Sequence, residues 1–128
     1  MSDTPEVLVL DDEPIVCDRL KDYLQQRDFA VETFTASEAA LQRLTEKSFD
    51  VVVTDVKMSG PSGLDVLRHV QQHCATTPVI VITGYASLET AREAEILGSF
   101  DFICKPFQLQ ELHARVKRAA KQARKNRG

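Results

Sequence analysis

The chain has 128 residues, of which 43% are hydrophobic and 27% charged, and its formal net charge is -3. This length and composition are typical of one globular domain, and no run approaches the roughly 18 consecutive apolar residues that a membrane-spanning helix needs. Residues 1–6 are polar and do not resemble a signal peptide, so we expect a cytoplasmic protein. The three cysteines share no CxxC spacing, which argues against a zinc site and a disulfide framework.

The charges are unevenly distributed along the chain. Residues 113–128 hold seven of the 16 basic residues and no acid, which leaves nine bases against 19 acids in the remainder. An acidic body of this kind argues against nucleic-acid binding by the body itself. The basic end fits DNA binding or, as we favour, a solvated helical extension. We therefore assign residues 1–120 to the domain and 121–128 to a basic extension or linker.

Five short apolar runs alternate with segments of helical periodicity. The runs lie near residues 7–10, 29–34, 51–54, 79–83 and 100–104. Short runs rich in β-branched residues and bounded by polar turns indicate buried strands of a parallel sheet. Five strands in alternation with five helices predict an α/β fold around a central five-stranded parallel sheet.

Local signals predict where the helices begin. We expect the five helices to begin near Pro14, Thr35, Leu64, Ser87 and Gln108. Proline is favoured in the first turn of a helix, and Thr35 with Glu38 has the spacing of a capping box. Ser87 is a good N-terminal cap, and Gly98 is placed to end the same helix.

Charged residues follow three of the expected strands. Asp11 and Asp12 follow the first, Asp55 ends the third, and Lys105 follows the fifth. Because ligands of parallel sheets bind beyond the carboxyl ends of the strands, these side chains should converge at one edge. Neighbouring carboxylates repel one another unless a cation lies among them, and oxygen ligands suit Mg2+. The pattern therefore predicts a magnesium-assisted phosphoryl-transfer site.

The same motifs, with their order and spacing, resemble a known family. The chain is similar to the receiver domain of bacterial two-component response regulators, from Val7 to about Ala120, and most similar to receivers of the NtrC and FixJ types. One departure is Ser59, which stands where the family usually has proline after Met58. The motifs are Asp11-Asp12-Glu13, Asp55, Met58, Thr83-Gly84 and Lys105-Pro106-Phe107.

The resemblance implies a flavodoxin-like (βα)5 fold in three layers. It also implies a signalling domain, not an enzyme in the usual sense, that accepts a phosphoryl group from a histidine kinase on Asp55. Mg2+ would be held by Asp11, Asp12 and Asp55 and by the backbone carbonyl of Lys57. No histidine of this chain has the spacing of a phosphotransfer intermediate, so the donor should belong to another protein.

The resemblance further implies a conformational switch. Lys105 would contact one phosphoryl oxygen and Thr83 another, and movement of the Thr83 hydroxyl would let Phe102 turn inward. Repacking would then alter the face formed by the fourth helix, the fifth strand and the fifth helix. That face is the expected contact for an output domain, an effector protein or a second phosphorylated copy.

Simpler interpretations of single residues remain open. Asp11 and Asp12 could be ordinary acids at a helix N-terminus, Thr83 a strand former, and Phe102 a strand phenylalanine. Glu13 and the three histidines, His69, His73 and His113, are expected to be solvated.

Three other functions also remain open. A phosphatase of the haloacid dehalogenase type needs a second aspartate where Lys57 stands. A flavin or nucleotide binder needs a glycine-rich turn after the first strand, which this sequence lacks. A degenerate receiver that serves as a constitutive docking module is the third.

Overall fold

The computed structural model describes residues 4–58, 60–84 and 87–127, so Ser59 lies outside the described residues. Strands and helices alternate as the apolar runs predict. The strands are β1 (Glu6–Leu10), β2 (Ala30–Phe34), β3 (Val51–Asp55), β4 (Val79–Thr83) and β5 (Asp101–Cys104). The helices are α1 (Pro14–Gln25), α2 (Ser37–Glu46), α3 (Gly63–His73), α4 (Leu88–Ile96) and α5 (Leu109–Arg127).

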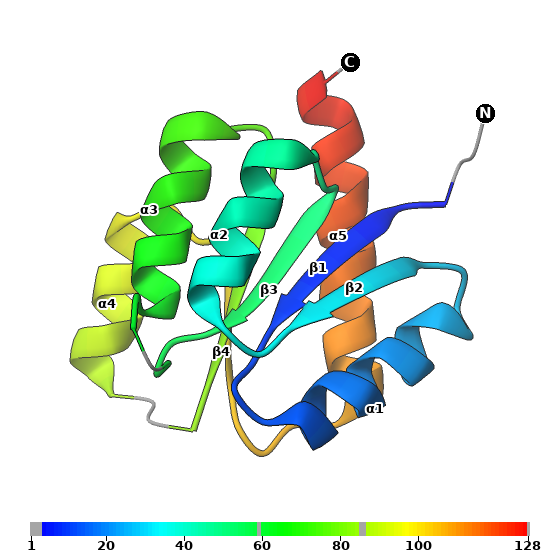
Figure 1. Cartoon of the computed structure of the whole chain (residues 1–128), viewed down its shortest axis with the longest axis horizontal. Coiled ribbons are helices and arrows are strands. Elements are labelled where there is room, and N and C mark those ends of the chain that lie inside the picture. The colour runs from blue at the N-terminus through cyan, green and yellow to red at the C-terminus, as the bar shows by residue number, and fades with distance from the viewer. Residues whose placement is uncertain (1–3, 59, 85–86, 128) are drawn as a thin grey trace.

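The five strands form one parallel sheet in the order β2-β1-β3-β4-β5. Helices α1 and α5 cover one face of the sheet, and α2, α3 and α4 cover the other (Figure 1). This arrangement confirms the flavodoxin-like three-layer fold. The strand order reverses between β1 and β3, and in such folds the crevice beyond that point is the usual place for a ligand.

Both faces of the central strands are buried. Val7 and Val9 pack with α1 and α5, whereas Leu8 and Leu10 pack with the helices on the opposite face. All residues of β3 and β4 are buried. A fully buried aliphatic side chain contributes about 1.5–3 kcal/mol, so these strands hold the sheet rigidly beneath the loops at their carboxyl ends.

Three of the predicted helix signals are confirmed. Pro14 is the first residue of α1. The Ser87 hydroxyl accepts a hydrogen bond from the backbone N–H of Thr90 at 3.0 Å and caps α4. Gly98, with φ +90°, adopts the left-handed conformation that commonly ends a helix.

The predicted cap of the second helix is wrong. Helix α2 is preceded by Ala36, whose side chain makes no capping hydrogen bond, so Thr35 is not the cap. A complete capping box begins α3 instead. The Ser62 hydroxyl accepts hydrogen bonds from the first turn, and the Asp65 carboxylate accepts one from the Ser62 N–H at 2.8 Å. This box fixes the start of the helix that follows β3.

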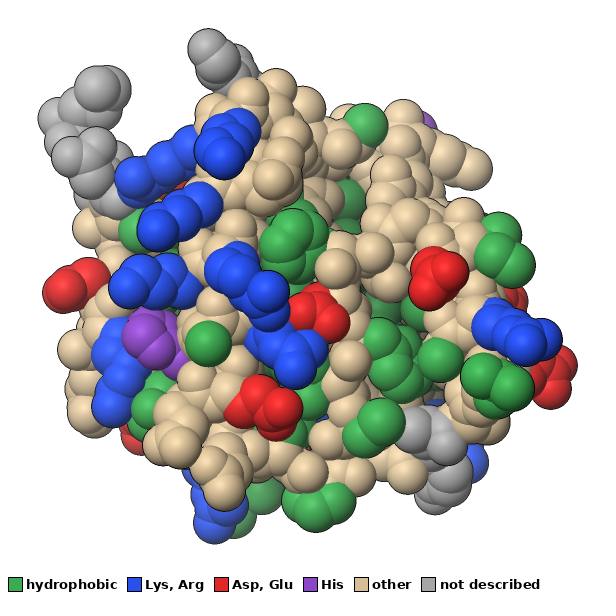
Figure 2. Space-filling view, turned by 180° about the vertical axis from the view of Figure 1, so that it is seen from behind, with side chains coloured by type: hydrophobic (Ala, Val, Ile, Leu, Met, Phe, Trp, Pro, Cys, Tyr) green, Lys and Arg blue, Asp and Glu red, His purple; other side chains and the backbone are tan. Residues whose placement is uncertain are grey.

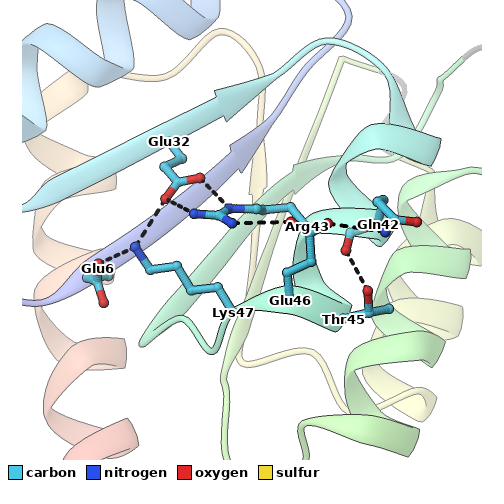
Figure 3. A network of polar contacts seen from close by, with 7 residues as sticks. All are labelled: Glu6, Glu32, Gln42, Arg43, Thr45, Glu46 and Lys47. Carbon is cyan, nitrogen blue, oxygen red and sulfur yellow. Dashed lines mark hydrogen bonds and ion pairs between the residues drawn. The ribbon is translucent and has the colours of Figure 1, made fainter.

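A network of ion pairs covers the edge strand β2 (Figure 3). Glu32 of β2 accepts hydrogen bonds from Arg43 of α2 at 2.8 and 3.2 Å and from Lys47 at 3.1 Å. Lys47 also pairs with Glu6 of β1 at 2.5 Å. The network ties the edge of the sheet to the end of α2, and charged residues at an edge strand discourage pairing with another chain.

Helix α5 continues without a break to Arg127. Its inner side is buried at Val116, Ala119, Ala120 and Ala123, and the Asn126 side chain donates a hydrogen bond to the Thr76 carbonyl at 3.3 Å. Lys and Arg side chains gather along α5 (Figure 2). Within the described part of the chain, no helix combines the length and the apolar character required to cross a membrane.

Candidate functional site

Three carboxylates meet where the order of the strands reverses. Asp11 and Asp12 follow β1, and Asp55 is the last residue of β3. One carboxylate oxygen from each lies within 4.8 Å of the other two. Asp11 is fully buried and Asp55 is 6% exposed, whereas Asp12 faces solvent. The sequence therefore correctly predicts the convergence of these side chains.

Lys105 brings a positive charge into this acidic cluster. Its ammonium group donates hydrogen bonds to Asp11 Oδ2 at 2.7 Å and to Asp55 Oδ2 at 2.9 Å, and lies 3.6 Å from Glu13 Oε1. Burial disfavours the charged form of Lys105, but its hydrogen bonds to the two aspartates outweigh this effect and raise its pKa. Lys105 therefore stays charged across the neutral range and partly neutralises the buried carboxylates.

The environment of Asp55 shifts its pKa upward. Burial raises the pKa of this carboxyl group, and the hydrogen bond and charge of Lys105 only partly oppose the shift. The backbone N–H of Lys57 also approaches Asp55 Oδ1, at 3.4 Å. Additional positive charge would stabilise the ionised form of a carboxyl group with a raised pKa. Acids with a shifted pKa at the carboxyl edge of a sheet are typical of functional sites.

The acidic cluster opens into a cavity of about 410 Å3 at the carboxyl edge of the sheet. Its lining consists of Asp12, Glu13, Asp55, Lys57, Met58, Gly84 and Lys105. Asp55 is the most buried of these acids and reaches the cavity from the centre of the sheet. A small anionic group that enters this cavity meets Asp55 and Lys105 together.

Thr83 ends β4, and Lys105 follows the neighbouring strand β5, on one side of the cluster. Thr83 is fully buried as the last residue of β4, and its carbonyl accepts a hydrogen bond from the Lys105 N–H at 2.8 Å. The Lys105-Pro106 peptide bond is cis. The backbone thus links the two residues for which sequence reasoning predicts contacts to a phosphoryl group.

Phe102 of β5 lies away from the acidic cluster. Its side chain is half-buried and packs against the cluster of apolar residues beneath α2, α3 and α4. The neighbouring Asp101 pairs with Arg115 of α5 at 2.8 Å. The Phe102 side chain therefore lies on the face of the sheet that α4 covers.

Two supporting contacts of Asp11 were missed by sequence reasoning. The Glu13 N–H donates to Asp11 Oδ1 at 2.9 Å, and the buried Cys17 thiol donates to the Asp11 carbonyl at 3.4 Å. Burial, with the nearby Asp11 charge, raises the pKa of Cys17 to about 11, so the thiol stays protonated. Cys17 lies one turn into α1 on its inner face, and this position in the sequence could have identified the contact with Asp11.

Comparisons with known sequences agree with this geometry. Residues 7–117 match the model of the response regulator receiver domain family. The chain is 33% identical over 123 residues to the transcriptional regulatory protein FixJ of Bradyrhizobium diazoefficiens, covering 96% of this chain and 60% of FixJ. It is 36% identical over 113 residues to the regulatory protein AtoC of Escherichia coli, covering 88% of this chain and 24% of AtoC. The chain thus spans only part of these relatives.

Solved structures give the same result. A response regulator receiver domain from Clostridium thermocellum superposes with a TM-score of 0.88 at 33% identity, over 94% of this chain and 97% of that one. The solution structure of the beryllofluoride-activated NtrC4 receiver domain dimer superposes with a TM-score of 0.87 at 30% identity, over 92% and 98% of the two chains. The chain therefore belongs to the family of response regulator receiver domains.

Proposed function

We propose that this receiver domain accepts a phosphoryl group on Asp55. The observation that carries the proposal is the position of Lys105, whose ammonium group bridges the buried carboxylates of Asp11 and Asp55 at 2.7 and 2.9 Å. One carboxylate oxygen of Asp55 thus accepts a hydrogen bond from the Lys105 ammonium group, and the other lies near the backbone N–H of Lys57. Asp55 is also the acid that reaches the cavity from the centre of the sheet.

The transfer requires no general base. Asp55 Oδ attacks the phosphorus of a phosphohistidine, a P–O bond forms, and the P–N bond breaks. The electron pair of the P–N bond stays on the donor imidazole. The main barrier is repulsion between an anionic nucleophile and an anionic donor, so positive charge at the site lowers it. Lys105 supplies such a charge to one phosphoryl oxygen, and the Thr83 hydroxyl can donate to another.

The acidic cluster fits a magnesium ion. It offers carboxylate oxygens from three residues within 4.8 Å of one another, and hard oxygen donors in this number suit Mg2+. We assign Asp11, Asp12, Asp55 and the Lys57 carbonyl to this site. Bound Mg2+ would offset negative charge on the phosphoryl oxygens. Asp12 is exposed and makes no hydrogen bond to Lys105, so its carboxylate can turn toward an ion without breaking that pairing.

The covalent charge acts as a switch in this proposal. A phosphoryl group on Asp55 adds nearly two negative charges and attracts the Thr83 hydroxyl at the end of the neighbouring strand. Phe102, half-buried on the strand beyond, then turns toward the space left by Thr83. The surface formed by α4, β5 and α5 changes shape as a result.

The partners follow from the same assignment. The phosphoryl donor is a histidine kinase, and the α4-β5-α5 surface receives an output domain, an effector protein or a second copy. The dimer described for the NtrC4 receiver supports the last of these. A cytoplasmic location belongs to the proposal, since all three cysteines are free thiols, as is usual in a reducing compartment. The proposal does not include direct binding of nucleic acid by the acidic body.

Phosphorylation by acetyl phosphate tests the proposal. With Mg2+ present, intact mass should show one phosphoryl adduct in the wild type and none in Asp55→Asn. Asp22→Asn, which changes an exposed acid of α1, is the matched control and should keep the adduct. Asp12→Ala should lose both the adduct and the Mg2+-dependent amide shifts. Absence of any adduct in the wild type would instead favour a constitutive docking module.

A further inference from the structure

Two histidines of α3 lie side by side on one face of the helix. His69 and His73 are four residues apart, which places them one turn apart on the same face. Their ring centroids are 4.6 Å apart, with 42° between the ring planes. His69 is half-buried, and His73 is exposed as the last residue of α3. Within the described parts of the chain, neither imidazole has a hydrogen-bond partner. A ring nitrogen of each is therefore available to bind an ion.

Both histidines line a hollow of about 610 Å3 between residues of α2 and α3. Its lining consists of Leu44, Thr45, Glu46, Lys47, Ser48, His69, His73 and Cys74. The lysine of this lining, Lys47, is paired with Glu6 and Glu32 at 2.5 and 3.1 Å (Figure 3). Its charge is therefore compensated. The carboxylate of Glu46, which also lines the hollow, pairs with Arg43 at 3.2 Å.

The position of the pair at the end of a helix favours positive charge. The hollow lies at the C-terminal end of α3, where the helix dipole attracts positive charge. Burial, together with the neighbouring His73, lowers the pKa of His69 below its ordinary value.

We propose that His69 and His73 together chelate one divalent transition-metal ion of the zinc, nickel and copper class. Paired histidines four residues apart on a helix are an established zinc-binding arrangement, and imidazole nitrogen suits these metals rather than Mg2+. Among the described residues, no third acid, cysteine or histidine completes a three-ligand cluster with this pair. Water therefore fills the remaining coordination positions, and the site stays open to a further ligand.

This site is distinct from the acidic cluster in position and in chemistry. The acidic cluster offers oxygen donors at the carboxyl edge of the sheet, whereas the histidine pair offers nitrogen donors at the far end of α3. The pair is close only when residues 69–73 are helical, so an ion bound there favours the folded last turn of α3. Cys74 follows directly, and the chain then leads into β4 through residues 75–78.

Zinc titration of the full chain tests this inference. The imidazole Cε1–H signals are followed by NMR, with excess Mg2+ present to occupy the acidic cluster. The first equivalent of Zn2+ should shift the signals of His69 and His73 together and leave that of His113 unchanged. His113 lies on α5 and contacts Tyr23 and Phe29, so it serves as an internal control.

Substitutions provide the second arm. His69→Gln and His73→Gln should each weaken Zn2+ binding by more than about tenfold, because one imidazole cannot chelate. His113→Gln should leave the affinity unchanged. Zinc should also raise the melting temperature of the wild type by more than that of His73→Gln. Equal affinity in wild type and both α3 variants, or shifts confined to amides around Asp55, would overturn the inference.

Discussion

Gly63 lies so close to Asp55 that no side chain fits between them, since a Cβ atom on Gly63 would lie 1.9 Å from the Asp55 carbonyl oxygen. Gly63 begins α3, and its N–H donates to the Val56 carbonyl at 2.8 Å. The chain thus folds back on itself directly after the proposed phosphoacceptor. The absence of a side chain at residue 63 lets the start of α3 hold the end of β3 in place.

Gly63→Ala should therefore displace the end of β3. Side-chain rotation cannot relieve a clash between a Cβ atom and the backbone. We therefore expect a loss of about 2–3 kcal/mol in the free energy of unfolding, measured by urea denaturation. The adduct from acetyl phosphate should form more slowly. Gly84→Ala is the control for stability, because its Cβ would meet only the Lys105 Cβ, at 3.9 Å. Equal stability of the two variants would contradict the steric argument.

Lys105→Met should expose the repulsion between Asp11 and Asp55. The variant keeps the apolar stem but removes the charge that pairs with both carboxylates, so we expect a loss of about 3 kcal/mol at neutral pH. Mg2+ should stabilise this variant more than the wild type, because the acidic cluster then lacks its own cation. Lys105→Arg keeps a charge and should lie between the two. Urea unfolding with and without Mg2+ measures these differences; an unchanged stability of Lys105→Met would count against the pairing.

Glu32→Gln should weaken the edge of the sheet in a pH-dependent way. Hydrogen bonds from Arg43 and Lys47 lower the pKa of Glu32, although burial opposes them. A carboxyl group with a lowered pKa stabilises the fold above its unfolded pKa, and the gain disappears as the pH falls through the folded value. We expect a loss of about 0.5–1 kcal/mol at pH 7 and almost none in strong acid.

The pH series needs a control for the loss of a charge. Glu95→Gln removes an exposed acid of α4 that forms no ion pair with any residue of the described chain. Its effect on the unfolding free energy should be small across the same pH range. If Glu32→Gln destabilised the protein equally at acidic and neutral pH, the cause would be packing rather than charge.

Removal of residues 121–128 tests the proposed domain boundary. The segment buries the Ala123 methyl group and contributes the Asn126 hydrogen bond to Thr76, so it should contribute only about 1 kcal/mol. The melting temperature should fall by less than about 4 °C, and the phosphoryl adduct should persist. Leu112→Ala, in the buried stripe of α5, is the contrasting variant and should cost about 2–5 kcal/mol. A larger loss on truncation than in Leu112→Ala would place the tail within the fold.

The sequence predicts the sheet and the acidic cluster because both depend on short-range patterns. Buried parallel strands are continuous apolar runs, and the residues that follow them must meet at one edge. The sequence alone therefore predicts that Asp11, Asp55 and Lys105 lie together. It does not predict their hydrogen bonds, because the path of the Lys105 side chain depends on the turns around it.

Features that depend on backbone detail escaped the sequence analysis. Thr35 has the spacing of a capping residue, but Ala36 occupies that position in the structure. Ser62 and Asp65 form a capping box at the start of α3, which the sequence analysis did not predict. The pairing of Glu32 with Lys47 depends on how the edge strand and the end of a helix lie relative to each other. The hydrophobic periodicity of the sequence does not predict that arrangement.

Helix α5 begins beside the carboxyl edge of the sheet and ends near its opposite edge (Figure 1). Its 19 residues correspond to about 28 Å of helix. A segment joined beyond residue 127 would therefore start at the opposite end of the domain from Asp55. A change at Asp55 would reach such a segment through α5, whose inner side is buried against the sheet.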